Sequence, residues 1–188
     1  MKPLLSIIIA TRNRKQYCIN SIETILNFPG NDFELVVQDN TDNFDLKDYI
    51  NSNISDSRLI YNYTPPPFSS IDNFNAALDL ANGEYLCLIG DDDSISQQLI
   101  EVVKWAQKNN IESICPSYFS EYIWPETFGN KKDSTLITPK TSGGLIRIDP
   151  ANVLHEFFKA GLLDYLGKGF PKLYHGVVKR SCFAKIKA

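Results

Sequence analysis

The sequence lacks the segments that direct a protein into or across a membrane. No apolar run approaches the roughly 18 residues that a membrane-spanning helix requires. The amino-terminal segment MKPLLSIIIATRNR has only a short apolar stretch, with no small-residue cleavage site behind it. We therefore expect a cytoplasmic protein without a transmembrane segment in this chain, and we leave open a peripheral contact with the inner face of the membrane.

Cysteine and histidine are too sparse for a disulfide framework or a zinc site. The four cysteines are far apart and form no CxxC pair, and the chain has only two histidines. Cys87 and Cys115 lie in apolar runs typical of strands, so we expect reduced thiols in the core.

The chain also lacks an excess of positive charge. Nineteen Lys and Arg residues stand against 22 Asp and Glu residues, which gives a formal net charge of -3. This balance offers no general basic field for nucleic acid, so no nucleic-acid partner is expected. With 188 residues, of which 43% are hydrophobic, the chain fits one domain, or one domain with an extension, around a substantial core.

Several phosphate-binding and nucleophile motifs are absent. There is no GxxxxGK[ST] loop, no GxGxxG after the first predicted strand and no GxSxG elbow. The sequence ATRNR after that strand contains no carboxylate, which excludes the nucleophile of haloacid dehalogenase phosphatases.

Predicted strands and helices alternate over the first 110 residues. The strands are expected at 4–10, 33–39, 58–63, 84–89 and 112–118, and the helices at 14–27, 44–53, 70–81 and 96–110. The run LLSIIIA is apolar on both faces, as in a strand covered on both sides. The pattern predicts an α/β fold, a three-layer α/β/α sandwich around a mainly parallel, Rossmann-like sheet.

The helix at 70–81 is expected to turn one apolar side toward the sheet. The residues of that side are Ile71, Phe74, Ala77, Leu78 and Ala81. Asn82-Gly83 is interpreted as the stop signal at the end of this helix. Later in the chain, 149–161 is expected to form a helix and 173–188 a strand that enters another helix.

Polar residues follow three of the predicted strands directly. They are Thr11, Arg12 and Asn13 after the first, Asp39 and Asn40 after the second, and Asp91, Asp92 and Asp93 after the fourth. Ligands of parallel sheets bind beyond the carboxyl ends of the strands. One cleft could therefore collect all three groups.

Three consecutive aspartates repel one another, and a bound cation would compensate for that repulsion. Mg²⁺ typically takes one or two carboxylates from protein, and phosphate and water complete its shell. A metal held there would neutralise a diphosphate leaving group. The alternative is a solvated acidic turn that caps the following helix.

Four segments together resemble family 2 glycosyltransferases of the A-type (GT-A) fold. LLSIIIATRNR matches the first strand with its Thr-x-Asn-Arg motif, and FELVVQDNTDN matches the acidic end of the second. NFNAALDLANGEY matches the helix that runs into the fourth strand, and LIGDDDSI matches the DxD-type metal motif. The resemblance covers roughly residues 4 to 105 and implies a nucleotide-diphospho-sugar transferase.

The resemblance implies roles for individual residues. The nucleotide-sugar donor would be lined by Ala10, Thr11 and Arg12, with Asn13 bracing the turn, and also by Asp39, Asn40, Asn75 and Asp91. Asp39 or Asn40 would read the base edge, and Asp91 would approach the ribose or the diphosphate. Asp92 and Asp93 would hold Mn²⁺ or Mg²⁺ as the cofactor.

The same resemblance implies a metal-dependent, inverting transfer from a UDP- or dTDP-sugar to a saccharide or lipid-linked acceptor of bacterial surface polysaccharide. An inverting transfer needs a general base, which in this family lies well downstream of the metal motif. We therefore expect a donor-binding core at 1–120, the start of an acceptor-side half at 121–188, and the base beyond Ala188, in which case this chain would turn over poorly. Two alternatives remain: a sugar nucleotidyltransferase, which should carry a glycine-rich loop where this chain has ATRNRKQY, and a nucleotide-sugar-binding module without turnover.

Overall fold

The computed structural model of the chain describes residues 2–116, 121–123, 135–137, 149, 151–152, 155, 159 and 175–183. The chain divides into two compact units, residues 1–114 together with 172–188, and residues 115–171. The first unit contains every residue of the predicted site. Residues 172–188, which we expected at the start of an acceptor-side half, return to this first unit.

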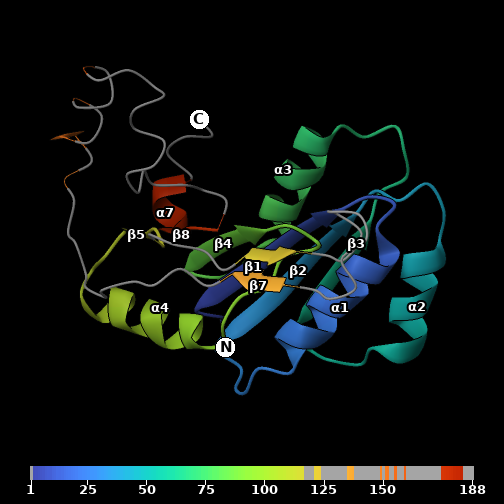
Figure 1. Ribbon diagram of the computed structural model, residues 1–188, viewed down its shortest axis with the longest axis horizontal. Coiled ribbons are helices and arrows are strands. Elements are labelled where there is room, and N and C mark those ends of the chain that lie inside the picture. Colours follow the sequence, from blue (N-terminus) through green and yellow to red (C-terminus); the bar gives the residue numbers. More distant parts are fainter. Residues whose placement is uncertain are drawn as a thin grey trace. The chain divides into compact units, whose positions relative to one another are not determined.

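The first unit is built on a six-stranded sheet with the order β3-β2-β1-β4-β8-β5 (Figure 1). Its strands are β1 (Leu5–Thr11), β2 (Phe33–Asp39), β3 (Leu59–Tyr63), β4 (Tyr85–Ile89), β5 (Ser113–Ile114) and β8 (Val177–Lys179). β1 pairs in parallel with β2 and β4, and β2 with β3, whereas β8 is antiparallel to both β4 and β5. The mainly parallel α/β sheet predicted from the sequence is confirmed.

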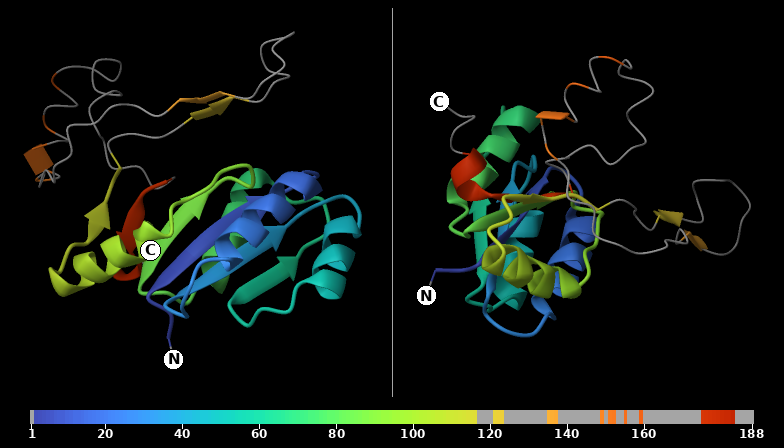
Figure 2. Two further views of the ribbon diagram at one scale, coloured as in Figure 1. Left: turned by 60° about the horizontal axis from the view of Figure 1, so that its bottom comes forward. Right: turned by 90° about the vertical axis from the view of Figure 1, so that its left-hand side faces the viewer.

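Helices cover both faces of this sheet, as the two views of Figure 2 show. They are α1 (Lys15–Leu26), α2 (Asp45–Asn53), α3 (Ser70–Leu80), α4 (Gln98–Lys108) and the short α7 (Arg180–Phe183). The buried side chains of α1, α2 and α4 share one apolar cluster with one face of the sheet, and α3 packs in a second cluster on the opposite face. None of the described helices is long and apolar enough to span a bilayer.

Strand β1 supplies apolar side chains to both clusters, which explains its continuous apolar run. Ile7 and Ile9 lie in the cluster with α1, α2 and α4, whereas Ile8 lies in the cluster with α3, and all three are fully buried. Such a strand contributes apolar burial on both sides, at about 25 cal/mol per Å² of apolar surface. The rigid sheet that results fixes the positions of the strand ends.

The apolar side predicted for α3 is wrong at Ile71, which is 71% exposed. The buried positions of this helix are Asn73 and Ala77, one turn apart. The helix begins after Ser69, whose Oγ accepts a hydrogen bond from the backbone N–H of Asp72 at 3.0 Å. This cap fixes the residue at which the helix begins, and the buried side of the helix carries a polar residue, Asn73.

From the sequence we expected Gly83 to end α3 in a left-handed conformation. In the structure Gly83 follows α3 but does not adopt that conformation. Its φ lies outside the positive range, and the helix ends at Leu80 with an extended Ala81. A Cβ at Gly83 would lie 2.5 Å from the backbone nitrogen of Ser6. The glycine is therefore required by the close approach of this turn to β1, where its N–H donates to Ser6 Oγ at 2.7 Å.

Substitution of Gly83 should destabilise the fold in proportion to side-chain size. We expect Gly83→Ala to lower the free energy of unfolding by about 1–3 kcal/mol, because the neighbouring atom is backbone and cannot yield. Urea unfolding would measure this loss. Gly30 is the matched control: its φ is +84° and its Cβ would meet nothing within 4 Å. Asparagine adopts that conformation readily, so Gly30→Asn should cost much less than Gly83→Asn, and equal losses would contradict the steric explanation.

All four cysteines are free thiols in the structure. Cys18 and Cys87 are buried in the core, whereas Cys182 is half-buried, and so is Cys115, which we expected in the core. Burial raises the pKa of the Cys87 thiol to about 12 and raises that of Cys18 as well. Both buried thiols are therefore protonated at neutral pH and inert as nucleophiles.

The second unit contains a two-stranded antiparallel pair, β6 (Glu121–Ile123) with β7 (Thr135–Ile137).

The strand predicted at 112–118 is shorter in the structure, since β5 covers only Ser113–Ile114. The predicted helix at 149–161 lies largely outside the described residues.

Candidate functional site

The strand order reverses between β1 and β4, because the chain builds β2 and β3 on one side of β1 and then crosses to β4 on the other. Such a switch point leaves a crevice at the carboxyl ends of the strands, where ligands of open α/β sheets bind. The carboxyl ends of β2, β1 and β4 are direct neighbours. The polar residues that follow these three strands are thus brought to one edge of the sheet.

Hydrogen bonds join these three strand ends. Thr11 Oγ1 donates to Asp91 Oδ2 at 2.7 Å, which connects the end of β1 with the acidic turn after β4. The backbone N–H of Asn40 donates to the carbonyl of Thr11 at 3.0 Å, which connects the end of β2 with that of β1. Thr11, Asn40 and Asp91 are all buried, so the base of the site is fixed.

The carboxylate of Asp39 is buried, and both of its oxygens accept hydrogen bonds from the protein. Its Oδ1 accepts from the backbone N–H of Thr41 at 2.8 Å, and its Oδ2 accepts from Tyr61 OH at 2.7 Å. Burial first, and then the Asp39 carboxylate, raise the pKa of Tyr61, so the phenol stays protonated as the donor. Of the two residues proposed to read a base edge, Asp39 holds the loop and Asn40 lines the cavity described below.

The loop after β1 is fastened to the loop after β2. Asn13 has a positive φ of 58°, donates through Nδ2 to Asp42 at 2.6 Å and accepts from the N–H of Asp42 at 3.0 Å. Arg12 adds an ion pair to the same carboxylate at 2.9 Å. Hydrogen bonding by Asn13, followed by that of Arg12, lowers the pKa of Asp42. Arg12 and Asn13 therefore shape the rim of the site.

Arg14 bridges two of the three consecutive aspartates. Its guanidinium contacts Asp91 Oδ1 at 2.9 Å and Asp92 Oδ2 at 2.6 Å, and it lies over the ring of Tyr17 at 4.8 Å from the centroid. The hydrogen bond to Asp92 is the largest influence raising the pKa of Arg14. A guanidinium thus compensates part of the acidic turn, a role that our sequence analysis did not assign.

Asp91 is the most buried member of the acidic turn, with 4% of its surface exposed. Burial raises the pKa of its carboxyl group, and the hydrogen bond from Thr11 and the charge of Arg14 oppose this shift only in part. An ionised Asp91 is therefore costly to the fold at neutral pH. A further positive charge at this position would be stabilising.

Asp93 closes the acidic turn and contacts a residue from the other end of the chain. Its Oδ2 accepts from the backbone N–H of Gly90 at 2.7 Å and lies 2.7 Å from Nε2 of His175. His175 has a positive φ of 62°, and its own N–H donates to the carbonyl of Leu88 at 2.8 Å. The segment entering β8 is thereby held against the end of β4.

The carboxylates of the acidic turn could supply only part of the coordination of a divalent cation. Among the described residues, no group of three or more His, Cys, Asp or Glu side chains could enclose a metal ion. Asp92 has a side chain that is 37% exposed, and hard carboxylate oxygens are the donors that Mg²⁺ and Mn²⁺ accept. A ligand phosphate and water would then have to supply the remaining coordination.

A cavity of about 150 Å³ lies beside this turn. It is lined by Ala10, Thr11, Arg12, Asn40, Ser70, Asn73 and Phe74. Four of these residues were predicted to line a donor from the sequence, and the structure places them around one hollow. The other three come from the start of α3 and were not predicted.

Asn75, the α3 residue that we predicted to contact the donor, is exposed, whereas Asn73 is buried and lines the cavity. Both asparagines have the same local composition around them, so residue type alone does not distinguish them. The Ser-x-x-Asp sequence from Ser69 to Asp72, an amino-terminal capping signal, marks the start of the helix but not the side of it that is buried.

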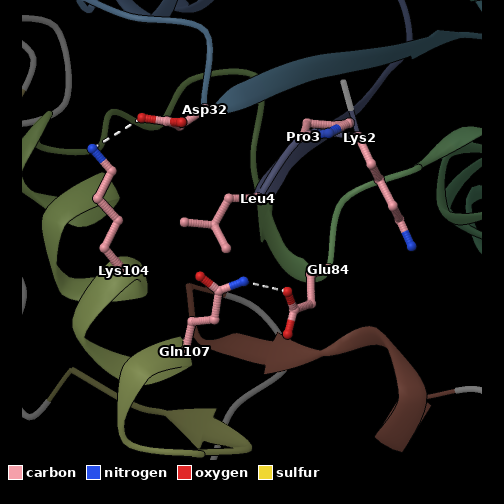
Figure 3. Close-up of a pocket in the computed structure, with 7 residues that line it drawn as sticks. All are labelled: Lys2, Pro3, Leu4, Asp32, Glu84, Lys104 and Gln107. Carbon is pink, nitrogen blue, oxygen red and sulfur yellow. Dashed lines mark hydrogen bonds and ion pairs between the residues drawn. The ribbon is translucent and has the colours of Figure 1, made fainter.

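A larger hollow of about 400 Å³ lies at the opposite edge of the sheet, near the amino ends of the strands (Figure 3). Lys104 forms an ion pair with Asp32 at 2.9 Å there, and Gln107 donates a hydrogen bond to Glu84 at 2.5 Å. The hollow contains none of the predicted site residues. The larger volume of this hollow does not make it the candidate site, because the predicted site residues lie at the carboxyl ends of the strands.

Proteins with known names resemble parts of this chain. WcaA of Escherichia coli (strain K12), whose name gives it as a glycosyl transferase of colanic acid biosynthesis, is 27% identical over 141 residues, or 74% of this chain and 50% of the relative. The GalNAc(5)-diNAcBac-PP-undecaprenol beta-1,3-glucosyltransferase of Campylobacter jejuni is 34% identical over 98 residues, or 50% of this chain and 31% of the relative. This chain therefore spans half or less of the length of these curated relatives.

Solved structures show a weaker likeness. The crystal structure of S. aureus TarS 1-349 in complex with UDP-GlcNAc matches 63% of this chain and 39% of that chain, with a TM-score of 0.48 and 20% identity.

The model of the family described as glycosyl transferase family 2 matches residues 6–166, which is most of the chain. The match extends from β1 past the acidic turn and includes the residues of the candidate site other than His175. The chain belongs to glycosyl transferase family 2.

Proposed function

We propose that this protein binds a nucleoside diphosphate-sugar together with Mn²⁺ or Mg²⁺, and that it serves the inverting transfer of the sugar to a saccharide or lipid-linked acceptor. The donor is a uridine or thymidine diphosphate sugar. The setting is the synthesis of bacterial cell-surface polysaccharide.

The observation that carries this proposal is the contact between Thr11 and Asp91. It places a small, mainly apolar cavity, with a few polar side chains in its lining, next to an acidic turn at the switch point of a parallel sheet. A nucleoside diphosphate has a neutral end and an anionic end. The cavity suits the nucleoside, and the turn with Arg14 and a cation suits the diphosphate.

The chain's own residues divide this work. Thr11, Arg12 and Asn40 line the cavity and position the nucleoside, and Asp91 connects the cavity with the turn. Asp92 and Asp93 would hold the divalent cation, which when bound would neutralise the diphosphate as it leaves. His175 fixes the orientation of Asp93 through its ring nitrogen.

The names of two relatives support the class of acceptor. One is named for colanic acid biosynthesis, and the other for glucose transfer onto a glycan carried by undecaprenyl diphosphate. A saccharide or lipid-linked acceptor for this protein is therefore part of the proposal.

Thermal unfolding with a set of nucleoside diphosphates, each with and without Mn²⁺, tests the donor and the metal. A ligand that binds only the native state raises the melting temperature, by an amount equivalent to about 2.7 kcal/mol at 100 times its Kd. We expect UDP or dTDP with Mn²⁺ to give the largest rise. Asp92→Ala should remove the part that depends on Mn²⁺, whereas Asp45→Ala, an exposed change on α2, should not.

The same screen separates the proposal from its alternatives. A shift with ribonucleoside triphosphates that exceeds the shift with diphosphates would favour a nucleotidyltransferase. If none of the nucleotides changed the melting temperature, the proposed function would be wrong. If this protein bound the nucleotide but transferred no sugar, in an assay in which a family 2 glycosyltransferase of known activity does transfer sugar, a binding module would be favoured.

A further inference from the structure

Arg14 occupies oxygen atoms that a divalent cation at the acidic turn would need. Its guanidinium contacts Asp91 Oδ1 at 2.9 Å and Asp92 Oδ2 at 2.6 Å, so it takes one oxygen from each of two neighbouring carboxylates. Asp92 is one of the two proposed ligands of the cation. Two positive charges at one carboxylate repel each other. A metal ion and the guanidinium therefore compete for Asp92 in the ligand-free protein.

The acidic turn is held in place, whereas the Arg14 side chain lies at the surface. Thr11 Oγ1 donates to Asp91 Oδ2 at 2.7 Å, and Ser21 Oγ donates to the backbone carbonyl of Asp91 at 2.8 Å. The Arg14 side chain is 43% exposed, and besides the aspartates it contacts the ring of Tyr17, which is itself partly exposed. Exposed side chains change rotamer rapidly, so Arg14 can leave the aspartates while the turn keeps its shape.

Arg58 is a contrasting arginine that is fixed in the fold. Its side chain is only 14% exposed and pairs with Asp56. It also donates to three backbone carbonyls, those of Leu26, Phe28 and Gly30. Within the described part of the chain, the guanidinium of Arg14 donates to carboxylates only. The partners of Arg14 are thus anionic groups, which another anion can replace.

A diphosphate is an anion of the required kind. Guanidinium groups bind phosphate oxygens through two parallel N–H···O hydrogen bonds, as they bind carboxylates. Asp91 contacts Arg14 through one oxygen and Thr11, which lines the cavity of about 150 Å³, through the other. One side chain therefore separates the lining of the cavity from the guanidinium. A diphosphate that extends from this cavity toward the acidic turn would meet Arg14.

We propose that Arg14 exchanges partners when the donor binds. In the empty protein the guanidinium compensates Asp91 and Asp92, and in the loaded protein it binds the diphosphate and leaves these aspartates to the divalent cation. This inference rests on the proposed function, because it requires a nucleoside diphosphate at this site. Its consequence is coupled binding. The guanidinium opposes the cation until a diphosphate draws it away, and by linkage the cation strengthens diphosphate binding by the same factor.

Titration of Mn²⁺ followed by electron paramagnetic resonance, without UDP and with saturating UDP, tests the exchange in the wild-type protein and in Arg14→Gln. Without the competing guanidinium, Arg14→Gln should bind Mn²⁺ alone about fivefold more tightly than wild type or better, the lower end of typical coupling between two sites. With UDP bound, the two proteins should bind Mn²⁺ almost equally, because the guanidinium has then left the aspartates in wild type. The factor by which UDP tightens Mn²⁺ binding should thus be smaller in Arg14→Gln.

Lys15→Gln is the matched control for these titrations. It removes the same charge from the next residue, but the Lys15 ammonium lies over the ring of Tyr49, 5.8 Å from the centroid. A long-range effect of charge would tighten Mn²⁺ binding in both variants alike, whereas the exchange predicts a change in Arg14→Gln alone. If Arg14 only supported the fold, Arg14→Gln would bind Mn²⁺ more weakly than wild type or with the same affinity.

The wild-type protein gives a second readout that does not depend on the stability of a variant. In nitrogen-15 spectra of the arginine side chains, the Arg14 signal is identified by its absence from Arg14→Lys. This signal should stay in place with Mg²⁺ at the concentration that saturates the UDP complex, and should shift when UDP is added with Mg²⁺. The Arg58 signal is the internal reference and should not move, since three backbone carbonyls hold its guanidinium.

Each outcome bears on one idea. If UDP fails to bind in the presence of Mn²⁺ or Mg²⁺, the proposed function is wrong. If UDP binds with metal but Arg14→Gln binds Mn²⁺ alone no more tightly than wild type, the exchange is wrong and the proposed function stands. The same holds if the Arg14 signal does not move with UDP and Mg²⁺. A signal that moves with Mg²⁺ alone would also contradict the exchange, because the guanidinium would then leave without a diphosphate to receive it.

Discussion

Asp91→Asn is expected to stabilise the ligand-free protein at neutral pH and to weaken Mn²⁺-dependent UDP binding tenfold to a hundredfold. Burial raises the pKa of Asp91 in the folded protein above its ordinary value of 3.8. As pH rises, the unfolded chain releases this proton first, so stability is lost until the folded carboxyl group has ionised. Asparagine does not ionise and avoids this loss. A charged hydrogen bond to ligand or cation is worth about 1.5–3 kcal/mol, which gives the expected loss of affinity.

Urea unfolding between pH 3.5 and 8 in EDTA measures the stability part of this prediction. The difference in free energy of unfolding between Asp91→Asn and wild type should grow as pH rises from 4 and then level off. Asp42→Asn is the matched control, because hydrogen bonds from Asn13 and Arg12 lower the pKa of Asp42. Asp42 thus stabilises the fold above its ordinary pKa, and its removal should act in the opposite direction. A loss of more than about 1 kcal/mol in Asp91→Asn at pH 8, which is typical of a destabilising substitution, would show that the carboxylate supports the fold.

The sheet could be predicted because its signals are local and strong. The run from Leu5 to Ile9 is apolar at nearly every position, as a strand covered on both faces must be. The polar residues after β1, β2 and β4 could also be placed at one edge, because parallel strands share their carboxyl edge. The mainly parallel sheet and the gathering of these residues therefore follow from the sequence.

The phase of α3 could not be predicted from apolar periodicity. Its buried stripe contains Asn73 and Ala77, a polar and a small residue, whereas Ile71 is exposed near the cavity. A binding site conflicts with the rule that apolar residues face inward, because it needs polar atoms there. The periodicity therefore fails at Asn73, a residue that lines the cavity.

The contact of Arg14 with the acidic turn could not be predicted for a different reason. Arg14 is separated from Asp92 by 78 residues, and no local pattern connects them. The order of β1 and β4 in the sheet brings them together. From sequence alone, Arg14 was equally compatible with a solvated loop charge. The repulsion among three aspartates indicated a cation, but not that an arginine would supply part of the charge.

Arg14→Gln should lower the free energy of unfolding by about 2–3 kcal/mol at pH 8 in the absence of metal. Removal of one partner of a buried ion pair typically costs 3–5 kcal/mol, and the half-exposed Arg14 side chain reduces that figure. The loss should shrink as the pH falls and Asp91, whose pKa is raised by burial, becomes protonated. Arg12→Gln is the matched control, since Arg12 pairs with Asp42, whose side chain is 54% exposed. Its cost should stay below about 0.5 kcal/mol.

Two further experiments, the addition of metal and a second substitution, test whether the loss of stability in Arg14→Gln arises from uncompensated negative charge. Mn²⁺ or Mg²⁺ should raise the melting temperature of Arg14→Gln more than that of wild type, because the cation then meets the aspartates without a competing guanidinium. Asp91→Asn introduced into Arg14→Gln should recover at least 1 kcal/mol, the coupling expected of groups in direct contact. If the two substitutions were additive and neither metal restored stability, Arg14 would act by packing against Tyr17 instead. The acidic turn would then be compensated in some other way, and the proposed cation site would lose its main support, because that site requires aspartates that need positive charge.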